Sequence, residues 1–307
     1  MKALTASSSK SRQSSVAVIK RGAHLGAEIT GVDLTQPPDE SDFTFIEGAF
    51  VENQVLVFRD QDISLDQYVA FARRFGEITV HPFRSREAGS NKLADTGRTD
   101  YPELIILDNS GDKPPHSTDQ WHSDESFRET PPAATLLRSV ISPEIGGDTV
   151  FASMTAAYDG LPVALQQFYE TLVALNDFKV FRSLYSHNYD GRQKLVEMEE
   201  IYPNMAHPVV RIHPISKKKL IYVSPQTTTE IVGVREFESE KILDMLYRLP
   251  EIPEYQFRVK WEPNMIVIWD NRSVQHYAPR DYLPHHRRME RLTIKGDRPY
   301  GVAGPIR

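Results

Sequence analysis

The chain has 307 residues, of which 40% are hydrophobic and 25% charged, and its formal net charge is −6. This composition is ordinary for a globular protein and implies no nucleic-acid partner, which would need a basic surface. Cysteine is absent, which excludes disulfides and thiolate metal sites, so histidines and carboxylates must hold any metal. No run approaches the roughly 18 apolar residues that span a bilayer; we expect a cytoplasmic protein without a membrane partner.

The first part of the chain predicts a tail followed by short strands and two helices. Residues 1–15 are rich in serine and lysine; they lack a secretory signal and are expected to be disordered, ahead of one domain over residues 16–307. The predicted elements that follow are a strand from residue 16 to 19, a helix over 42–51, a strand over 55–58, and a helix from Ser64, its N-cap, to about residue 75.

Residues 85–101 form a polar stretch with two glycines and no apolar periodicity. Long segments of this kind are usually functional loops or linkers. We expect this one to close over a substrate as a lid.

The rest of the chain alternates short apolar runs with turns. Helical spacing predicts helices over 154–175, with a break at Leu161-Pro162, and over 235–249. Residues 191–200 are charged and expected to be exposed. The remaining predicted strands are 104–107, 135–140, 149–151 and several short ones after residue 209. With no repeat or linker, the pattern indicates an α+β protein whose mainly β core is a barrel or jelly roll flanked by helices.

Two separated blocks carry the residues best suited to metal chemistry. His122 and Asp124 are two residues apart, so on a strand they would share one face. A second block near the end of the chain contains Trp269-Asp270-Asn271-Arg272 and His276. Two histidines and one carboxylate on one face of a metal are typical of non-haem Fe(II) oxygenases. A bare His-x-Asp pair also arises by chance. The flanking residues therefore determine whether this pair is interpreted as a metal site.

Those flanking residues resemble the Fe(II)/2-oxoglutarate dioxygenases of the taurine and 2,4-dichlorophenoxyacetate dioxygenase type (TauD/TfdA family). The matching blocks, in the family's order, are residues 26–34, 121–127, 131–132, 146–149 and 269–297. The resemblance implies a double-stranded β-helix, a distorted jelly roll, with flanking helices. It also implies an enzyme that converts 2-oxoglutarate and O2 to succinate and CO2 while hydroxylating a substrate C–H bond.

The resemblance further implies a role for each site residue. His122, Asp124 and His276 would bind Fe(II). Arg287 and Thr149 would hold the far carboxylate of 2-oxoglutarate, for which arginine offers a bidentate fork. Arg291 would lie near the cosubstrate's metal-binding carboxylate and the anionic head of the substrate, whereas Arg288, one step along a strand, would point the other way.

The implied substrate is a small or medium organic anion: an alkyl sulfonate, an alkyl sulfate or an aryloxyalkanoate. Hydroxylation at the carbon that bears such a group would release sulfite, sulfate or a phenol. An acylated amino acid or a secondary metabolite is the alternative. The residues expected to line the substrate site are His81, Arg84, Thr118, Phe181, Arg182, Tyr222 and Arg291. Arg84 and Thr118 replace residues of the taurine enzyme's pattern, which argues against taurine itself. A homodimer or homotetramer is expected.

The functional and site assignments above have simpler alternatives. The fold could serve a non-catalytic module that senses a small acid, or a halogenase, although a halogenase needs the position of Asp124 to be open. Arg287, Arg288 and Arg291 could be a surface cluster. Trp121, Phe127, Val267 and Trp269 are predicted to pack in the core. His207 and His213 are predicted to be structural, and the residues expected to be solvated are His116, His187, His285, His286 and Lys217 to Lys219.

Overall fold

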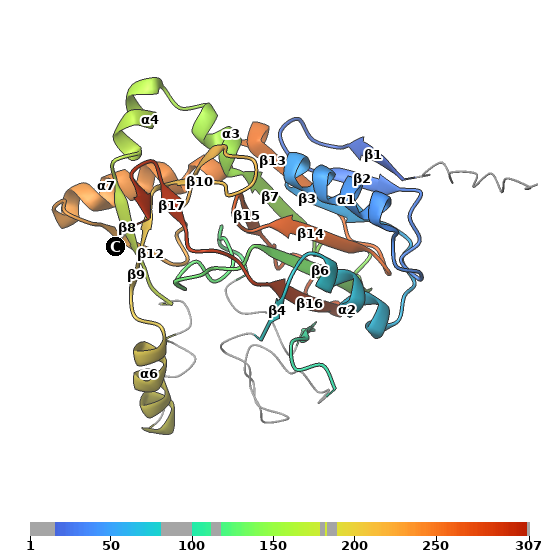
Figure 1. Cartoon of the computed structure of the whole chain (residues 1–307). Coiled ribbons are helices and arrows are strands. Elements are labelled where there is room, and N and C mark those ends of the chain that lie inside the picture. Colours follow the sequence, from blue (N-terminus) through green and yellow to red (C-terminus); the bar gives the residue numbers. More distant parts are fainter. Residues whose placement is uncertain (1–15, 81–99, 112–117, 179–181, 183–188, 306–307) are drawn as a thin grey trace, which may run out of the picture.

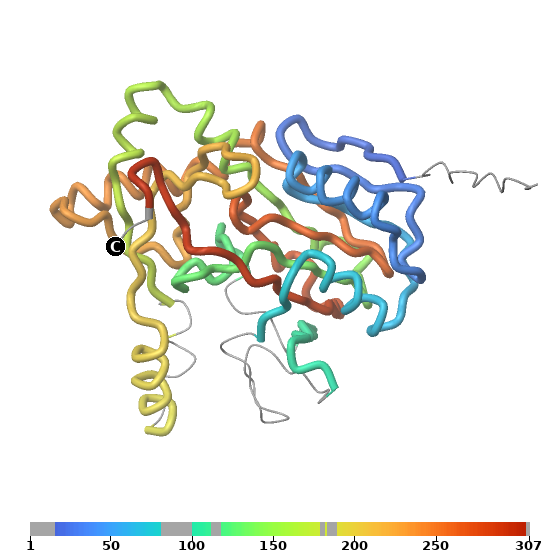
Figure 2. Tube along the Cα trace, viewed as in Figure 1, coloured from blue at the N-terminus to red at the C-terminus, as the bar shows by residue number. Residues whose placement is uncertain are grey.

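The computed structural model describes residues 16–80, 100–111, 118–178, 182 and 189–305. The predicted tail and nearly all of the predicted lid lie outside these residues. The described part of the chain is mixed, with more sheet than helix, and is shown in Figures 1 and 2. None of its helices combines the length and apolar character needed to cross a bilayer.

A large sheet forms the centre of the molecule, in the order β1-β2-β3-β14-β6-β16-β4, with β5 also paired to β16. Its strands are antiparallel except for the parallel pair β2 and β3. Their bounds are β1 Ala17–Lys20, β2 Ala27–Thr30, β3 Val55–Phe58, β4 Ile78–Thr79, β5 Ile105–Asn109, β6 Ala134–Ile141, β14 Ile266–Asp270 and β16 Arg287–Ile294.

Both faces of this sheet are covered. In β3, Val55 and Val57 face one apolar cluster while Leu56 and Phe58 face another. The first cluster lies against a second antiparallel sheet, β13 (Gln256–Val259)–β7 (Thr149–Ser153)–β15 (Val274–Tyr277). The other lies under helices α1 (Glu40–Asn53) and α2 (Leu65–Arg74). Burial on both faces explains why β3 is a continuous apolar run rather than an alternating one.

Both early helices are confirmed, and the N-cap predicted at Ser64 is present; α1 extends two residues beyond its predicted range at each end. The side chain of Asp39 accepts a hydrogen bond from Asp42 N at the start of α1. Ser64 and Gln67 form a reciprocal capping box at the start of α2, which satisfies two backbone donors. Gly76, just beyond α2, has a φ of +143°. The predicted strands over 16–19, 55–58, 104–107, 135–140 and 149–151 are confirmed to within two residues.

The predicted helix over 154–175 is only partly correct. It splits into α3 (Met154–Asp159) and α4 (Val163–Tyr169), on either side of the predicted break. Residues 173–176 instead form strand β8, because they pair with β9 (Met205–Pro208) and β12 (Thr228–Ile231). These partners are distant in the sequence, and their pairing overrides the local helical pattern.

The charged segment 191–200 is exposed as predicted, but it is helical. It forms α6 (Tyr189–Ile201), in which Met198 alone is buried, and Figure 1 shows this helix projecting away from the sheets. The predicted helix over 235–249 is confirmed as α7 (Glu236–Tyr247). The remaining elements are η1 (Leu249–Glu251), η2 (Pro253–Tyr255), β10 (Val210–Ile212), β11 (Lys219–Ile221), β17 (Tyr300–Gly301) and β18 (Gly304–Pro305).

Candidate metal centre and anion site

His122, Asp124 and His276 are brought together between the two facing sheets. His122 and His276 are backbone partners in an isolated antiparallel bridge, with N···O distances of 3.1 and 2.8 Å. Their imidazole centroids are 4.1 Å apart. Asp124 Oδ1 lies 3.9 Å from His122 Nε2 and 3.8 Å from His276 Nε2. One potential ligand atom from each residue therefore lies within 4.8 Å of the others, and all three residues are buried.

The segment that carries His122 is not the strand that its spacing predicted. Residue 122 makes the single bridge to β15, and a turn begins at Asp124. Ser123 anchors the segment, because its hydroxyl contacts Asn271 O at 2.5 Å and Val274 O at 3.0 Å. The bridge and this anchor, rather than strand alternation, place His122 and Asp124 at one site.

The protonation of the three residues suits a metal. Burial lowers the pKa of His122. Burial and the neighbouring His122 lower the pKa of His276 further. Both imidazoles are therefore neutral near pH 7 and keep a lone pair. Burial acts to raise the pKa of Asp124, but the charge of Arg291, the two imidazoles and a hydrogen bond from Thr135 outweigh it and hold that pKa well below its usual range.

The donor set fits Fe(II). Two neutral imidazoles and one carboxylate on a single face leave further coordination positions for other ligands. His122 Nδ1 lies 2.7 Å from Gln120 O, so the ring donates through Nδ1 and presents Nε2 to the site. The chain thus provides both the ligand atoms and the partner that orients one of them.

Arg287 provides a buried cation on β16. Its side chain donates from Nε to Gly147 O at 3.1 Å, and among the described residues it has no ion pair with a carboxylate. Burial lowers its pKa to about 10, so it stays charged near neutral pH. Gly147 has a φ of +71°, and a Cβ there would lie 3.3 Å from Arg287 Cδ. Glycine at 147 therefore lets the arginine pass close to the turn. The hypothesis of a surface cluster is wrong for Arg287.

Thr149 and Arg287 are linked by a residue that the sequence did not single out. Trp261 Nε1 donates to Thr149 Oγ1 at 2.9 Å, and its ring lies 5.9 Å from the Arg287 guanidinium carbon. Since Thr149 Oγ1 accepts from the indole, its own hydrogen is available to donate to an anion. A buried guanidinium and a hydroxyl donor together fit a carboxylate such as the far end of 2-oxoglutarate.

Arg291 contacts the metal centre directly. Its Nη2 lies 2.9 Å from Asp124 Oδ1. Arg288, by contrast, pairs with Asp108 at 3.0 Å, and both side chains are more than a third exposed. The prediction that Arg288 points away from the site is therefore confirmed.

The residues expected to bind substrate are less completely described. His81, Arg84 and Phe181 lie outside the described residues. Thr118 is half-buried and pairs through its backbone with Ala278, two residues beyond His276. Arg182 is bound to Asp177 through two contacts of 2.9 and 3.1 Å and also to Glu199. Two carboxylates already neutralise Arg182, which weakens the hypothesis that it receives an anionic substrate.

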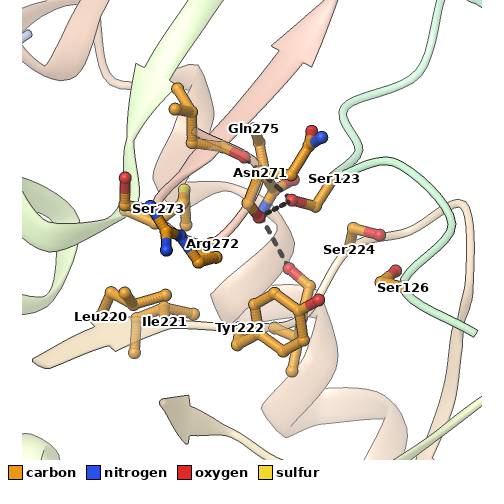
Figure 3. A pocket seen from close by; sticks show the side chains of 13 residues that line it. Ser123, Ser126, Leu220, Ile221, Tyr222, Ser224, Asn271, Arg272, Ser273 and Gln275 are labelled. Carbon is orange, nitrogen blue, oxygen red and sulfur yellow. Dashed lines mark hydrogen bonds between the residues drawn. The ribbon is translucent and has the colours of Figure 1, made fainter. Parts of the chain in front are cut away.

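Tyr222 lies in a compact apolar region beside the metal ligands. Its ring packs under the Arg211 guanidinium, 4.8 Å from the ring centroid. It lines a small cavity with Ser123, Ser126 and Gln275, shown in Figure 3. At about 10 Å³ this cavity has room for a water molecule but not for an organic substrate.

Several simpler interpretations are confirmed. Phe127, Val267 and Trp269 are buried core residues. His207 is buried and contacts Arg128 O, and His213 contacts the carboxylate of Asp270 at 3.0 Å. Trp121 is partly buried, packed against the cluster around Tyr222. The exposed residues include His285 and His286, while His116 and His187 lie outside the described residues.

Comparison with known proteins gives one consistent family. The family described as "Taurine catabolism dioxygenase TauD, TfdA family" matches residues 17–293. An alpha-ketoglutarate-dependent sulfonate dioxygenase of Saccharomyces cerevisiae is 37% identical over 284 residues, covering 90% of this chain and 66% of that protein. An alkylsulfatase of Acinetobacter baylyi is 33% identical, covering 93% of this chain and 86% of that protein.

A solved structure agrees with the sequence matches. The crystal structure of a taurine dioxygenase from Burkholderia xenovorans superposes with a TM-score of 0.77 at 32% identity, covering 94% of each chain. The similarity therefore extends over both facing sheets and the helices that flank them.

Proposed function

The chain belongs to the TauD, TfdA family of Fe(II)- and 2-oxoglutarate-dependent dioxygenases, and from that premise we propose that it hydroxylates a C–H bond of a small or medium organic anion at the His122–Asp124–His276 centre. The observation that carries the proposal is the convergence of these three buried ligands, with the cation Arg291 2.9 Å from Asp124. Sulfonates and sulfate esters are the leading substrates, because relatives at 37% and 33% identity are named for them.

Each residue of the site has a separate task. Fe(II), when bound, supplies the redox chemistry that couples cleavage of O2 and 2-oxoglutarate to C–H hydroxylation. His122, Asp124 and His276 hold the metal on one face. Arg287 and Thr149 bind the far carboxylate of 2-oxoglutarate and so fix its orientation. Arg291 offers a second cation for the cosubstrate's near carboxylate and the substrate's anionic group.

Burial of the centre supports catalysis by this arrangement. His122, Asp124 and His276 are each less than a tenth exposed. Exclusion of water strengthens the attraction between the arginines and their anionic ligands. The intact ligand set weighs against a non-catalytic module, as does the buried Arg287, which pairs with no carboxylate in the part of the chain that the structure describes. The presence of Asp124 weighs against a halogenase.

We also propose a fold type, a domain organisation and an oligomeric state for the chain. The two facing, mostly antiparallel sheets support a double-stranded β-helix, and the match over residues 17–293 supports a single domain over 16–307. A homodimeric or homotetrameric assembly in the cytoplasm rests on the family resemblance. Sedimentation velocity of the purified chain would measure its assembly directly.

The decisive test is succinate formation from 2-oxoglutarate in the presence of Fe(II) and candidate substrates. The screen covers alkyl sulfonates, alkyl sulfates, aryloxyalkanoates and acylated amino acids, each with a neutral analogue. We expect at least one acid to stimulate succinate formation and Asp124→Ala to abolish it. Asp108→Ala, which removes an exposed carboxylate paired with Arg288, should leave it intact. Full turnover in Asp124→Ala, or a neutral compound that outcompetes every acid, would refute the proposal.

A further inference from the structure

A chain of three buried hydrogen bonds ends on the carboxylate of Asp124. Thr135 Oγ1 donates to Asp124 Oδ2 at 2.7 Å. Asn271 Nδ2 donates to Thr135 Oγ1 at 2.9 Å, and Trp269 Nε1 donates to Asn271 Oδ1 at 2.9 Å. We propose that Thr135, Asn271 and Trp269 are positioning residues that hold one carboxylate oxygen and present the other to the metal. This inference rests on the metal-binding role of Asp124 in the proposed function.

The direction of these hydrogen bonds is set by Trp269. An indole N–H can only donate, so Asn271 must turn its amide oxygen toward Trp269 and its NH2 group toward Thr135. The oxygen of Thr135 then accepts from Asn271, which leaves its single hydrogen for Asp124. An isolated threonine could turn its hydroxyl elsewhere, whereas here the hydrogen bond from Asn271 directs the Thr135 hydroxyl hydrogen toward Asp124. The network therefore directs one hydrogen bond from Thr135 onto Asp124 Oδ2 and fixes the orientation of the carboxylate.

The three residues are held in place by the main sheet. Thr135 on β6 and Trp269 on β14 are register partners, so their side chains share the face that contains the metal centre. Asn271 follows β14, where its backbone N donates to Ala133 O at 3.0 Å. Its carbonyl accepts from Ser123, as Figure 3 shows. All three side chains are nearly completely buried, so water does not compete for their hydrogen bonds.

The network distinguishes the two oxygens of Asp124. Oδ2 is held by Thr135, while Oδ1 is the oxygen 3.8 and 3.9 Å from the histidine Nε2 atoms and 2.9 Å from Arg291 Nη2. A carboxylate fixed in this way binds a metal through one oxygen, which keeps the other coordination positions open. Trp269 also packs on the His276 ring, with centroids 4.9 Å apart. The same residue thus constrains two of the three ligands.

The test compares Mn(II) affinity, without cosubstrate or O2, in matched variants. Thr135→Val removes the hydroxyl at nearly constant volume, and Thr135→Ser restores it. Thr293 is the matched control: it faces Thr135 across the β6–β16 pair, is equally buried, and its hydroxyl has no hydrogen-bond partner among the described residues. We expect Thr135→Val to weaken Mn(II) binding by about 10- to 100-fold. Thr135→Ser and Thr293→Val should bind like the unsubstituted chain.

Co(II) absorption spectra provide a second readout, because they respond to ligand number and geometry. Thr135→Val should change the Co(II) spectrum, and Thr293→Val should not. If Thr135→Val fails to fold, Trp269→Phe keeps an aromatic ring, removes only the N–H, and should shift Mn(II) affinity in the same direction. Unchanged affinity and spectrum in the folded variant, or an equal loss in Thr293→Val, would overturn the positioning role. If the unsubstituted chain makes succinate in such a case, the proposed function stands; if it binds no Mn(II), both fail.

Discussion

Replacing Arg287 with leucine should separate cosubstrate binding from stability. The guanidinium is buried and, among the described residues, donates only to Gly147 O without an ion pair to a carboxylate. Loss of one partner from a buried charge pair costs about 3–5 kcal/mol. At 1.4 kcal/mol per decade, Arg287→Leu should weaken 2-oxoglutarate binding by roughly two to three and a half decades.

The same substitution should not destabilise the cosubstrate-free protein appreciably. Burial disfavours the charged form of Arg287, as its lowered pKa indicates. Relief of that cost offsets the hydrogen bond to Gly147, which is worth about 1 kcal/mol. A residue that served only packing would show the opposite result, with lower stability and little change in affinity.

The assay is calorimetric titration of 2-oxoglutarate into the Mn(II)-loaded protein, with urea unfolding of the metal-free protein in parallel. Arg288→Leu is the control, because Arg288 is the adjacent residue and makes an exposed pair with Asp108. Such pairs contribute about 0–1 kcal/mol to stability. Because Arg288 does not contact the anion site, 2-oxoglutarate affinity should stay close to that of the unsubstituted chain. Equal affinity in Arg287→Leu and the unsubstituted chain, or an equal loss in Arg288→Leu, would show that the arginine was misassigned.

Three further predictions follow from other contacts. Thr149→Val removes one hydrogen bond to an anion, so 2-oxoglutarate affinity should fall by about 1.5–3 kcal/mol; Trp261→Phe, which frees the Thr149 hydroxyl, should give a smaller loss in the same titration. Burial lowers the pKa of His207 to about 4, whereas the unfolded chain takes up a proton near pH 6.5. Stability should therefore be lost as the pH falls from about 6.5 toward 4, by roughly 3 kcal/mol, and His207→Leu should flatten that part of the urea-derived profile. Asp270 pairs in the interior with Arg272 and His213, so Asp270→Ala should lower the unfolding free energy by about 3–5 kcal/mol; a loss below 1 kcal/mol would contradict the importance of this buried pair.

The parts of the fold that depend on local signals were predictable from sequence. The capping box of α2 and the apolar run of β3 lie within a few residues of the elements they specify. Residues 173–175 were predicted to be helical because their strand partners, β9 and β12, come later in the chain. No local pattern reveals such pairing.

In the candidate site, too, some residues could be predicted from local sequence and others could not. His122, Asp124 and His276 stand in recognisable blocks, and their side chains meet in the structure. Thr135 and Trp261 were not singled out, because their importance depends on a side chain distant in the sequence: Asp124 for Thr135 and Thr149 for Trp261. Trp269 was predicted to pack in the core, which is correct, but its indole N–H also contacts Asn271.

The backbone bridge between His122 and His276 has a consequence for the order of assembly. The two residues are separated by about half of the chain, and their pairing closes only when β15 docks beside β7. Contacts between such distant segments form at a high entropic cost and set the pace of folding. A growing polypeptide would therefore lack a high-affinity iron site until its last strands are in place. Once formed, the occupied site would favour the folded state by mass action, so iron supply would affect how long each completed molecule survives in the cell.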